Sequence, residues 1–179
     1  RRVFHGASLA SLGHNRLPMA AVQTPAAERR LTIAELLDWL VEDGMVAPAD
    51  AEKMKKERRY YRGTQHPLSI IADQKWKSAK PPNKPLALEP LTEWLARRVN
   101  MEYKHIDPLK IDFSAVTDVM SISYATRFHI LPVGVTSKEV VIAVCEPYER
   151  AWEKELQRIT KLEIRRVIAN PVSIERCQV

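Results

Sequence analysis

The feature that most constrains the fold is a pair of apolar runs between residues 130 and 144. The first covers Ile130 to Val135, the polar residues Thr136-Ser137-Lys138 follow, and the second covers Glu139 to Val144. Two β-favouring runs with a short polar connection predict a hairpin. The consecutive apolar residues from Val140 to Val144 predict a strand covered on both faces. We therefore expect the core to be built on this hairpin, which carries no catalytic group.

Helical patterns flank the hairpin in the second half of the chain. Pro90 is expected to start a helix that Asn100 ends, with one apolar side made of Leu91, Trp94, Leu95 and Val99. Short helices are expected after Asp112 and Ser121, which can act as N-caps. A further helix after Pro147 is expected to place on its inner face Tyr148, Trp152, Leu156 and Ile159.

Two further segments complete the expected sheet. The segment "EYKHIDP" is a short candidate strand, and "EIRRVIANP" predicts a last strand followed by a short helix capped by Asn170. The predicted fold class is therefore α+β. We expect a small α/β sandwich of three to four strands with helices packed on the sheet, over residues 88–179, preceded by a small helical subdomain.

The helical subdomain is predicted over residues 30–62. Thr32 and Glu35 have the spacing of a capping box, and Gly44 can supply a left-handed C-cap. Pro48 is placed to start a second helix that runs to about Tyr60. Residues 63–87 hold Pro81, Pro82 and Pro85 among lysines, which predicts a stiff linker with Trp76 pinned against a domain face. Residues 1–29 show no sustained period and predict a mobile arm.

Composition limits the partners and the compartment. The 179 residues carry a formal net charge of +6 with a pI near 9.4, which favours an acidic protein face, anionic lipid or nucleic acid. No apolar run approaches the roughly 18 residues that span a bilayer. No secretory signal is evident at the start, and two cysteines do not indicate a disulfide framework. A cytoplasmic protein is expected.

Motifs for catalysis are missing from the sequence. No glycine precedes a lysine, so the chain has no phosphate loop of the G-x-x-x-x-G-K-[ST] type, and no G-x-S-x-G elbow occurs. The five histidines lack metal-site spacing, and His129 is interpreted as a strand-entry residue. Cys145 is expected to be buried with a raised pKa and inert. We therefore predict no catalytic, cofactor or metal residues and no enzymatic activity for this fragment.

The order of these elements resembles a known family. The segments "LVEDGMVAPADAEKM", "PLTEWLARRVNMEYKHIDPLKID", "ATRFHILPVGVTSKEVVIAVCEPYERAW" and "IRRVIANPVSIER" together resemble the N-terminal region of type II secretion and type IV pilus assembly ATPases. The resemblance covers roughly residues 31–178. Its most specific pieces are the "ILPV" strand, the "VVIAVCEP" strand that leads into a helix, and "IDPLKID".

The resemblance implies a bacterial accessory domain for protein transport or pilus assembly. In this family the ATPase domain, with its ATP and Mg²⁺, lies further along the chain and supports the hexamer. The N-terminal domain docks on the cytoplasmic domain of an inner-membrane platform protein and couples hydrolysis to secretion or pilus assembly. The chain is then expected to be peripheral to the inner membrane through its partner and to contact its own ATPase domain.

Some relatives in this family bind cyclic di-GMP through motifs that begin Arg-Leu-Gly. Alignment on Gly44 places Glu35-Leu36-Leu37 at the first such motif, and "HPLS" offers Pro67-Leu68-Ser69 for the second. The arginine that contacts guanine or phosphate and the glycine that permits close approach are missing at both. Arg30-Leu31-Thr32 has the arginine, but five residues too early. Cyclic di-GMP binding is therefore the alternative function.

Basic side chains are the expected contacts for the partner. The segment "KMKKERRYYR" is open to two interpretations, a solvated helix face or a docking face for an acidic partner. Nucleic-acid binding is a more distant alternative, because only Tyr60 and Tyr61 accompany the basic run. The predicted partner-binding residues are Lys55, Lys56, Arg58, Arg59 and Arg62 on the basic helix, and Arg165 and Arg166 on a basic edge strand.

Overall fold

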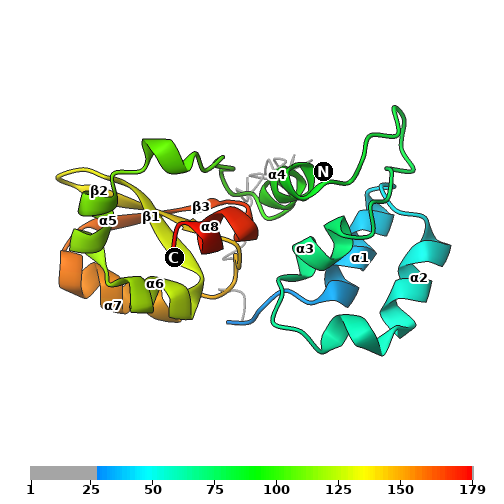
Figure 1. Cartoon of the computed structure of the whole chain (residues 1–179), viewed down its shortest axis with the longest axis horizontal. Coiled ribbons are helices and arrows are strands. Elements are labelled where there is room, and N and C mark those ends of the chain that lie inside the picture. Colours follow the sequence, from blue (N-terminus) through cyan, green and yellow to red (C-terminus); the bar gives the residue numbers. More distant parts are fainter. Residues whose placement is uncertain (1–27, 179) are drawn as a thin grey trace, which may run out of the picture.

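Two units lie side by side in the structure, which is a computed structural model that describes residues 28–178 (Figure 1). The predicted mobile arm lies almost entirely outside these residues. The elements of the helical unit are α1 (Ile33–Glu42), α2 (Pro48–Lys56), the 3-10 helix η1 (Arg58–Tyr61), α3 (Pro67–Ala72) and α4 (Leu88–Arg98). Those of the α/β unit are η2 (Pro108–Lys110), α5 (Phe113–Val119), α6 (Ile122–Phe128), β1 (Ile130–Val135), β2 (Glu139–Val144), α7 (Ala151–Thr160), β3 (Glu163–Ile168) and α8 (Pro171–Arg176).

The predicted hairpin is confirmed with the expected bounds. β1 pairs antiparallel with β2, with a register shift between Pro132 and Gly134, and β3 pairs parallel to β2. The order of the described sheet is β1-β2-β3, so β3 is an edge strand as expected. The parallel pairing is possible because α7 provides the long crossover that two parallel strands need. The segment "EYKHIDP" contributes one bridge, between Tyr103 and Ile168, in place of a strand.

Both faces of the sheet are buried, because alternate strand residues point to opposite sides. On one face, Ile142 and Val144 pack in the same cluster as Trp152 and Leu156 of α7. On the other face, a second cluster contains Leu131, Ala143 and Val167 of the three strands together with Val116 of α5 and Ile174 of α8. The sheet is thus a covered layer, and the predicted fold class, α+β with a small α/β sandwich and a helical portion before it, is confirmed.

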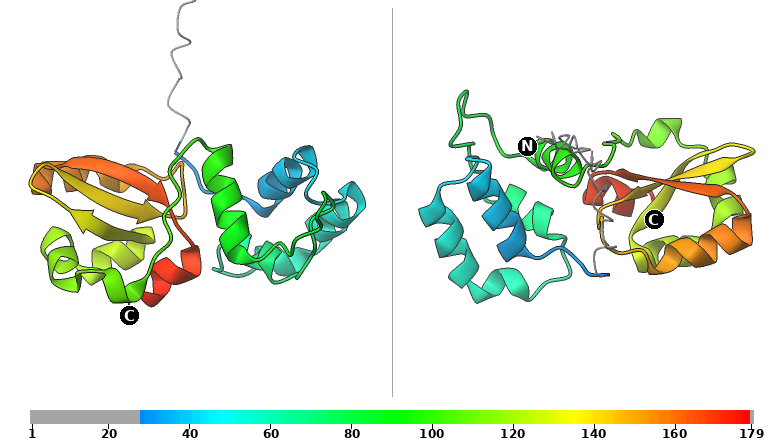
Figure 2. Two further views of the ribbon diagram at one scale, coloured as in Figure 1. Left: turned by 90° about the horizontal axis from the view of Figure 1, so that it is seen from above. Right: turned by 180° about the vertical axis from the view of Figure 1, so that it is seen from behind.

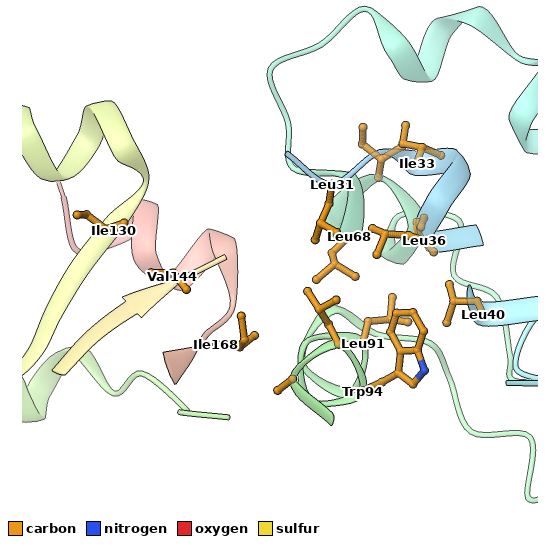
Figure 3. Packing of buried hydrophobic residues seen from close by; sticks show 14 of the residues in the cluster. Leu31, Ile33, Leu36, Leu40, Leu68, Leu91, Trp94, Ile130, Val144 and Ile168 are labelled. Atoms are coloured by element: carbon orange, nitrogen blue, oxygen red, sulfur yellow. The ribbon is translucent and has the colours of Figure 1, made fainter. Parts of the chain in front are cut away.

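The helical unit has its own buried centre, shown in Figure 3. Leu36 and Leu40 of α1, Leu68 of α3, and Leu91 and Trp94 of α4 all contribute to it, and each is at most 5% exposed. The indole nitrogen of Trp94 donates to Asp43 Oδ2 at 2.7 Å, so the one polar atom of this ring is satisfied. Gly44 has φ +68°, the left-handed value expected of the residue that ends α1.

The structure differs from the sequence expectations inside residues 63–87. Pro67–Ala72 forms α3, and its Leu68 and Ile71 are fully buried against the other helices. A six-residue helix is too short to show a helical period, and its N-cap is His66, which is not a usual capping residue. Trp76 is partly buried against the core, as expected. The division of the chain into four domain ranges remains a prediction.

Several local details also differ. Helix α4 starts at Leu88, before Pro90, and packs with α1 and α3 in the helical unit. The hydroxyl of Thr32 accepts from the Glu35 N–H, but the Glu35 carboxylate pairs with Arg29, so only half of the capping box forms. Ile159, expected on the inner face of α7, is 61% exposed and lies in the last turn of that helix, which ends at Thr160.

The two units are joined along α4, which lies between the sheet and the other helices of the helical unit in the views of Figures 1 and 2. The Glu89 carboxylate of α4 accepts from Tyr103 Oη and from Asn170 Nδ2 at 2.7 Å, and it contacts His105 Nδ1 at 2.8 Å. Burial works to raise the pKa of Glu89, but these hydrogen bonds outweigh it and the pKa is lowered. One cluster of buried residues runs through both units.

Candidate functional site

The predicted basic contacts on α2 and η1 divide into two kinds. Lys55 pairs with Asp38 and, at 2.8 Å, with Glu52, and Arg59 pairs with Glu57 at 2.7 Å. The charges of Lys55 and Arg59 are therefore balanced within the chain. These two side chains are less available to a partner than the sequence alone indicated.

The remaining cations of this segment are open to solvent. Lys56, Arg58 and Arg62 are exposed, and no carboxylate of residues 28–178 lies within 4.0 Å of their charged groups. Lys53 shares this property and lies one helical turn from Lys56 on the same side of α2. We call Lys53, Lys56, Arg58 and Arg62 the basic surface. Figure 1 shows α2 at the end of the helical unit that is remote from the sheet.

The two arginines of β3 are differently placed. Arg165 pairs with Glu102 at 2.6 Å and with Glu139 at 3.6 Å. Arg166 points to the other face, where its side chain is 17% exposed and donates to the Pro147 carbonyl at 2.8 Å. Burial, with the nearby Arg150, lowers the pKa of Arg166. The structure therefore does not bring Arg165 and Arg166 together with the basic surface.

A polar junction between the units was not found from the sequence. Glu146, just after β2, accepts from the Leu31 N–H at 2.8 Å, and its Oε1 lies 3.4 Å from His66 Nε2. A cavity of about 380 Å³ opens beside these groups, and Arg30, His129 and Glu175 are among its lining residues. Glu146 and His66 are each less than 10% exposed. Their separation by 80 positions in the sequence left no pattern to detect.

The reactive side chains near this cavity have structural roles. Burial raises the pKa of the Cys145 thiol, as predicted, and Cys145 Sγ lies 3.8 Å from the His129 carbonyl oxygen. His129 ends α6 with φ 51° immediately before β1, which confirms its interpretation as a strand-entry residue. Over residues 28–178, no group of three or more His, Cys, Asp and Glu side chains is arranged to hold a metal ion.

The positions that align with the cyclic di-GMP motifs are largely unavailable. Glu35-Leu36-Leu37 lies inside α1, and Leu36 and Leu37 are fully buried. In the second segment, Pro67 starts α3 and Leu68 is fully buried. A purine ring could not reach these leucine side chains without opening the helical core. Arg30 is exposed, but its guanidinium is held by Glu149 at 3.1 and 3.2 Å.

Within the described part of the chain, every helix is too short or too polar to cross a bilayer.

Comparison with known proteins places this geometry in a family. A family model described as the MshEN domain matches residues 99–178. The chain is 31% identical over 142 residues to the type IV pilus assembly ATPase TfpB of Acinetobacter baylyi (strain ATCC 33305 / BD413 / ADP1). That match covers 78% of this chain and 24% of the relative, so the chain spans about a quarter of the relative's length.

Two solved structures share the fold. The structure of MshE with cdg matches with a TM-score of 0.54 and 18% identity, covering 83% of this chain and 97% of that one. The N-terminal domain of XpsE matches with a TM-score of 0.50 and 14% identity, covering 84% and 96%. Both matches extend over the helical unit as well as the α/β unit. The chain therefore contains an MshEN domain at residues 99–178, is similar over 142 residues to a type IV pilus assembly ATPase, and shares its fold with the N-terminal domain of XpsE.

Proposed function

We propose that this chain is a non-catalytic docking module that binds the cytoplasmic domain of an inner-membrane platform protein. It thereby couples ATP hydrolysis by its parent protein to secretion or pilus assembly. The proposal rests on one observation: this chain has no phosphate loop, yet it matches about a quarter of the length of a pilus assembly ATPase. ATP and Mg²⁺ then act in the ATPase domain of the parent protein, which also forms the hexamer.

The basic surface supports this proposal as the contact. Its cations lie near no carboxylate of residues 28–178, so an acidic partner can pair with them without first displacing another ion pair among these residues. Exposed charges of this kind act mainly on the rate of encounter and on partner choice. Helix α2, which carries Lys53 and Lys56, also lies away from the sheet, so a partner bound there leaves the α/β unit free to contact the ATPase domain (Figure 1).

Charge reversal tests the docking proposal. We expect the triple change Lys56→Glu, Arg58→Glu and Arg62→Glu to reduce capture of the platform protein's cytoplasmic domain about tenfold or more, because attraction becomes repulsion at the surface. The measurement is surface plasmon resonance at physiological salt. The same three reversals at Lys104, Lys138 and Lys154, which are exposed in the α/β unit, change net charge equally and serve as the control. An equal loss of capture in both variants would show that only net charge matters. Unchanged capture in both variants would show that the basic surface is not part of the interface.

Cyclic di-GMP binding is the second candidate function, supported by the shared fold with MshE with cdg. The missing arginine and glycine and the buried Leu36 and Leu37 argue against the same mode of binding. We therefore expect a flat isothermal titration with cyclic di-GMP. A saturable binding heat that Arg30→Ala reduces would contradict this expectation. It would show that the chain binds cyclic di-GMP through contacts other than the Arg-Leu-Gly motifs. Lys104→Ala, an exposed cation of the α/β unit, is the matched control.

A further inference from the structure

The carboxylate of Glu146 lies buried at the boundary between the two units. Its side chain is 9% exposed, and it belongs to the turn that follows β2 in the α/β unit. Within residues 28–178, the Glu146 carboxylate accepts from the Leu31 N–H at 2.8 Å and lies 3.4 Å from His66 Nε2, and both of these groups come from the helical side of the junction. A buried carboxylate is costly unless it is paired. The helical unit therefore supplies what Glu146 needs in the closed arrangement.

His66 makes this compensation incomplete. Its Nδ1 accepts from the Leu68 N–H at 3.2 Å, so in the neutral ring the proton is on Nε2. That Nε2 is buried and has no hydrogen-bond partner among residues 28–178, although Glu146 Oε1 is only 3.4 Å away. A buried donor without a partner favours any arrangement that returns it to water. The closed junction thus contains a group that opposes closure.

The other contacts at this edge of the junction are mostly polar. Arg30 holds Glu149, the Glu28 carboxylate accepts from the Arg150 N–H at 3.1 Å, and Arg29 lies over the Tyr148 ring at 4.4 Å. Ion pairs in solvent contribute little to stability. A cavity of about 380 Å³ lies on this side, with Leu31, His66 and Glu146 among its lining residues. Glu146 is the buried carboxylate among these contacts, so we expect the closure of this edge to depend on it.

The opposite edge of the junction is apolar and covalently continuous. Helix α4 packs on β3, and Figure 3 shows Ile168 between the core of the sheet and Leu91 of α4. The chain passes from one unit to the other through residues 99–101, where Asn100 takes the left-handed conformation with φ 54°. This side can act as a hinge, because it stays connected when the segment at residues 28–31 moves away.

We propose that the hydrogen bond from the Leu31 N–H to the Glu146 carboxylate is a releasable contact between the two units, which we call the latch. When this contact breaks, the helical unit can turn about residues 99–101. In the closed state Glu146 holds the Leu31 N–H. In the open state the Glu146 carboxylate, the Leu31 N–H and the His66 ring regain water, which offsets part of the loss of their closed-state contacts. A partner that binds residues 28–31 or the exposed junction more tightly in the open state than in the closed state shifts the population towards the open state. This inference does not rest on docking at the basic surface.

Distance measurements between the units test the latch. Spin labels at Ala49→Cys on α2 and Lys154→Cys on α7, in a Cys177→Ser background, report the separation by pulsed electron spin resonance; both label sites are exposed. We expect Glu146→Ala to raise the population of long distances about tenfold, as estimated for the loss of a hydrogen bond to a charged acceptor. Glu146→Gln keeps an acceptor for Leu31 without the charge, so its effect should be intermediate.

The matched control is Glu149→Gln, because Glu149 lies in the same turn and pairs across the same junction with Arg30, whose side chain is 57% exposed. We expect its distance distribution to equal that of the parent. The latch is refuted if Glu146→Gln and Glu146→Ala leave the distribution unchanged, or if Glu149→Gln opens the junction as much. If Glu146→Ala does not fold, Glu146→Gln alone decides, since an amide of the same shape fits the site.

Discussion

Replacement of Trp152 by alanine is expected to lower the free energy of unfolding by about 3–5 kcal/mol, the usual range for a large buried aromatic side chain. Trp152 is fully buried on α7, where it packs in the same cluster as Ile142 and Val144 of β2. Its indole N–H donates to the Glu149 carbonyl at 3.1 Å, so the change also removes a hydrogen bond at the start of the helix. Urea unfolding followed by circular dichroism measures the loss.

The control for this change lies on the same helix. Ile159 is 61% exposed, and Ile159→Ala is expected to change the free energy of unfolding by no more than about 0.5 kcal/mol. A loss below about 1 kcal/mol for Trp152→Ala, against the range for buried aromatics, would contradict the packing of α7 on the sheet. The sequence placed both residues on the inner face of α7, so the pair also tests the helix orientation seen in the structure.

The core of the α/β unit was accessible from the sequence because its signals are local. The β-hairpin follows from two apolar runs and a three-residue connection, and the caps at Asp112, Ser121 and Asn170 follow from side chains that bond to N–H groups two or three residues on. Each of these interactions is complete within a few residues of the chain. They would form in almost any fold that contained the same segments.

The helical unit and the junction were less accessible because their determinants are distant in sequence. Helix α3 is short and is stabilised by burial of Leu68 and Ile71 rather than by an intrinsic signal. Glu35 satisfies Arg29 instead of closing its own cap. Glu146 and His66 meet only after both units have folded. Single-sequence patterns carry no information about such pairs.

The same distinction limits what could be said of the candidate site. The basic run in α2 and η1 was visible, but the structure was needed to see that Lys55 and Arg59 are paired with neighbouring acids. Arg166 also could not be recognised as half-buried, because its partner is the carbonyl of Pro147, which has no signature in the sequence. The charge of a side chain can be read from the sequence, whereas its availability to a partner depends on the acidic side chains that folding places near it.

Replacement of Leu36 by alanine is expected to destabilise the helical unit by about 2–5 kcal/mol, because Leu36 is fully buried and the change leaves a cavity. Leu36 of α1 and Trp152 of α7 belong to one buried cluster that spans both units. Leu36→Ala should therefore also lower the unfolding midpoint of the α/β unit, which can be followed through Trp152 in a background where Trp39, Trp76 and Trp94 are replaced by phenylalanine.

The control is Leu109→Ala, the same chemical change at a residue that is 95% exposed, for which no shift is expected. A midpoint for Trp152 that does not move in Leu36→Ala would contradict a shared core and show that the two units unfold independently. A shared shift has a mechanical consequence: force on the helical unit then reaches the sheet through α4.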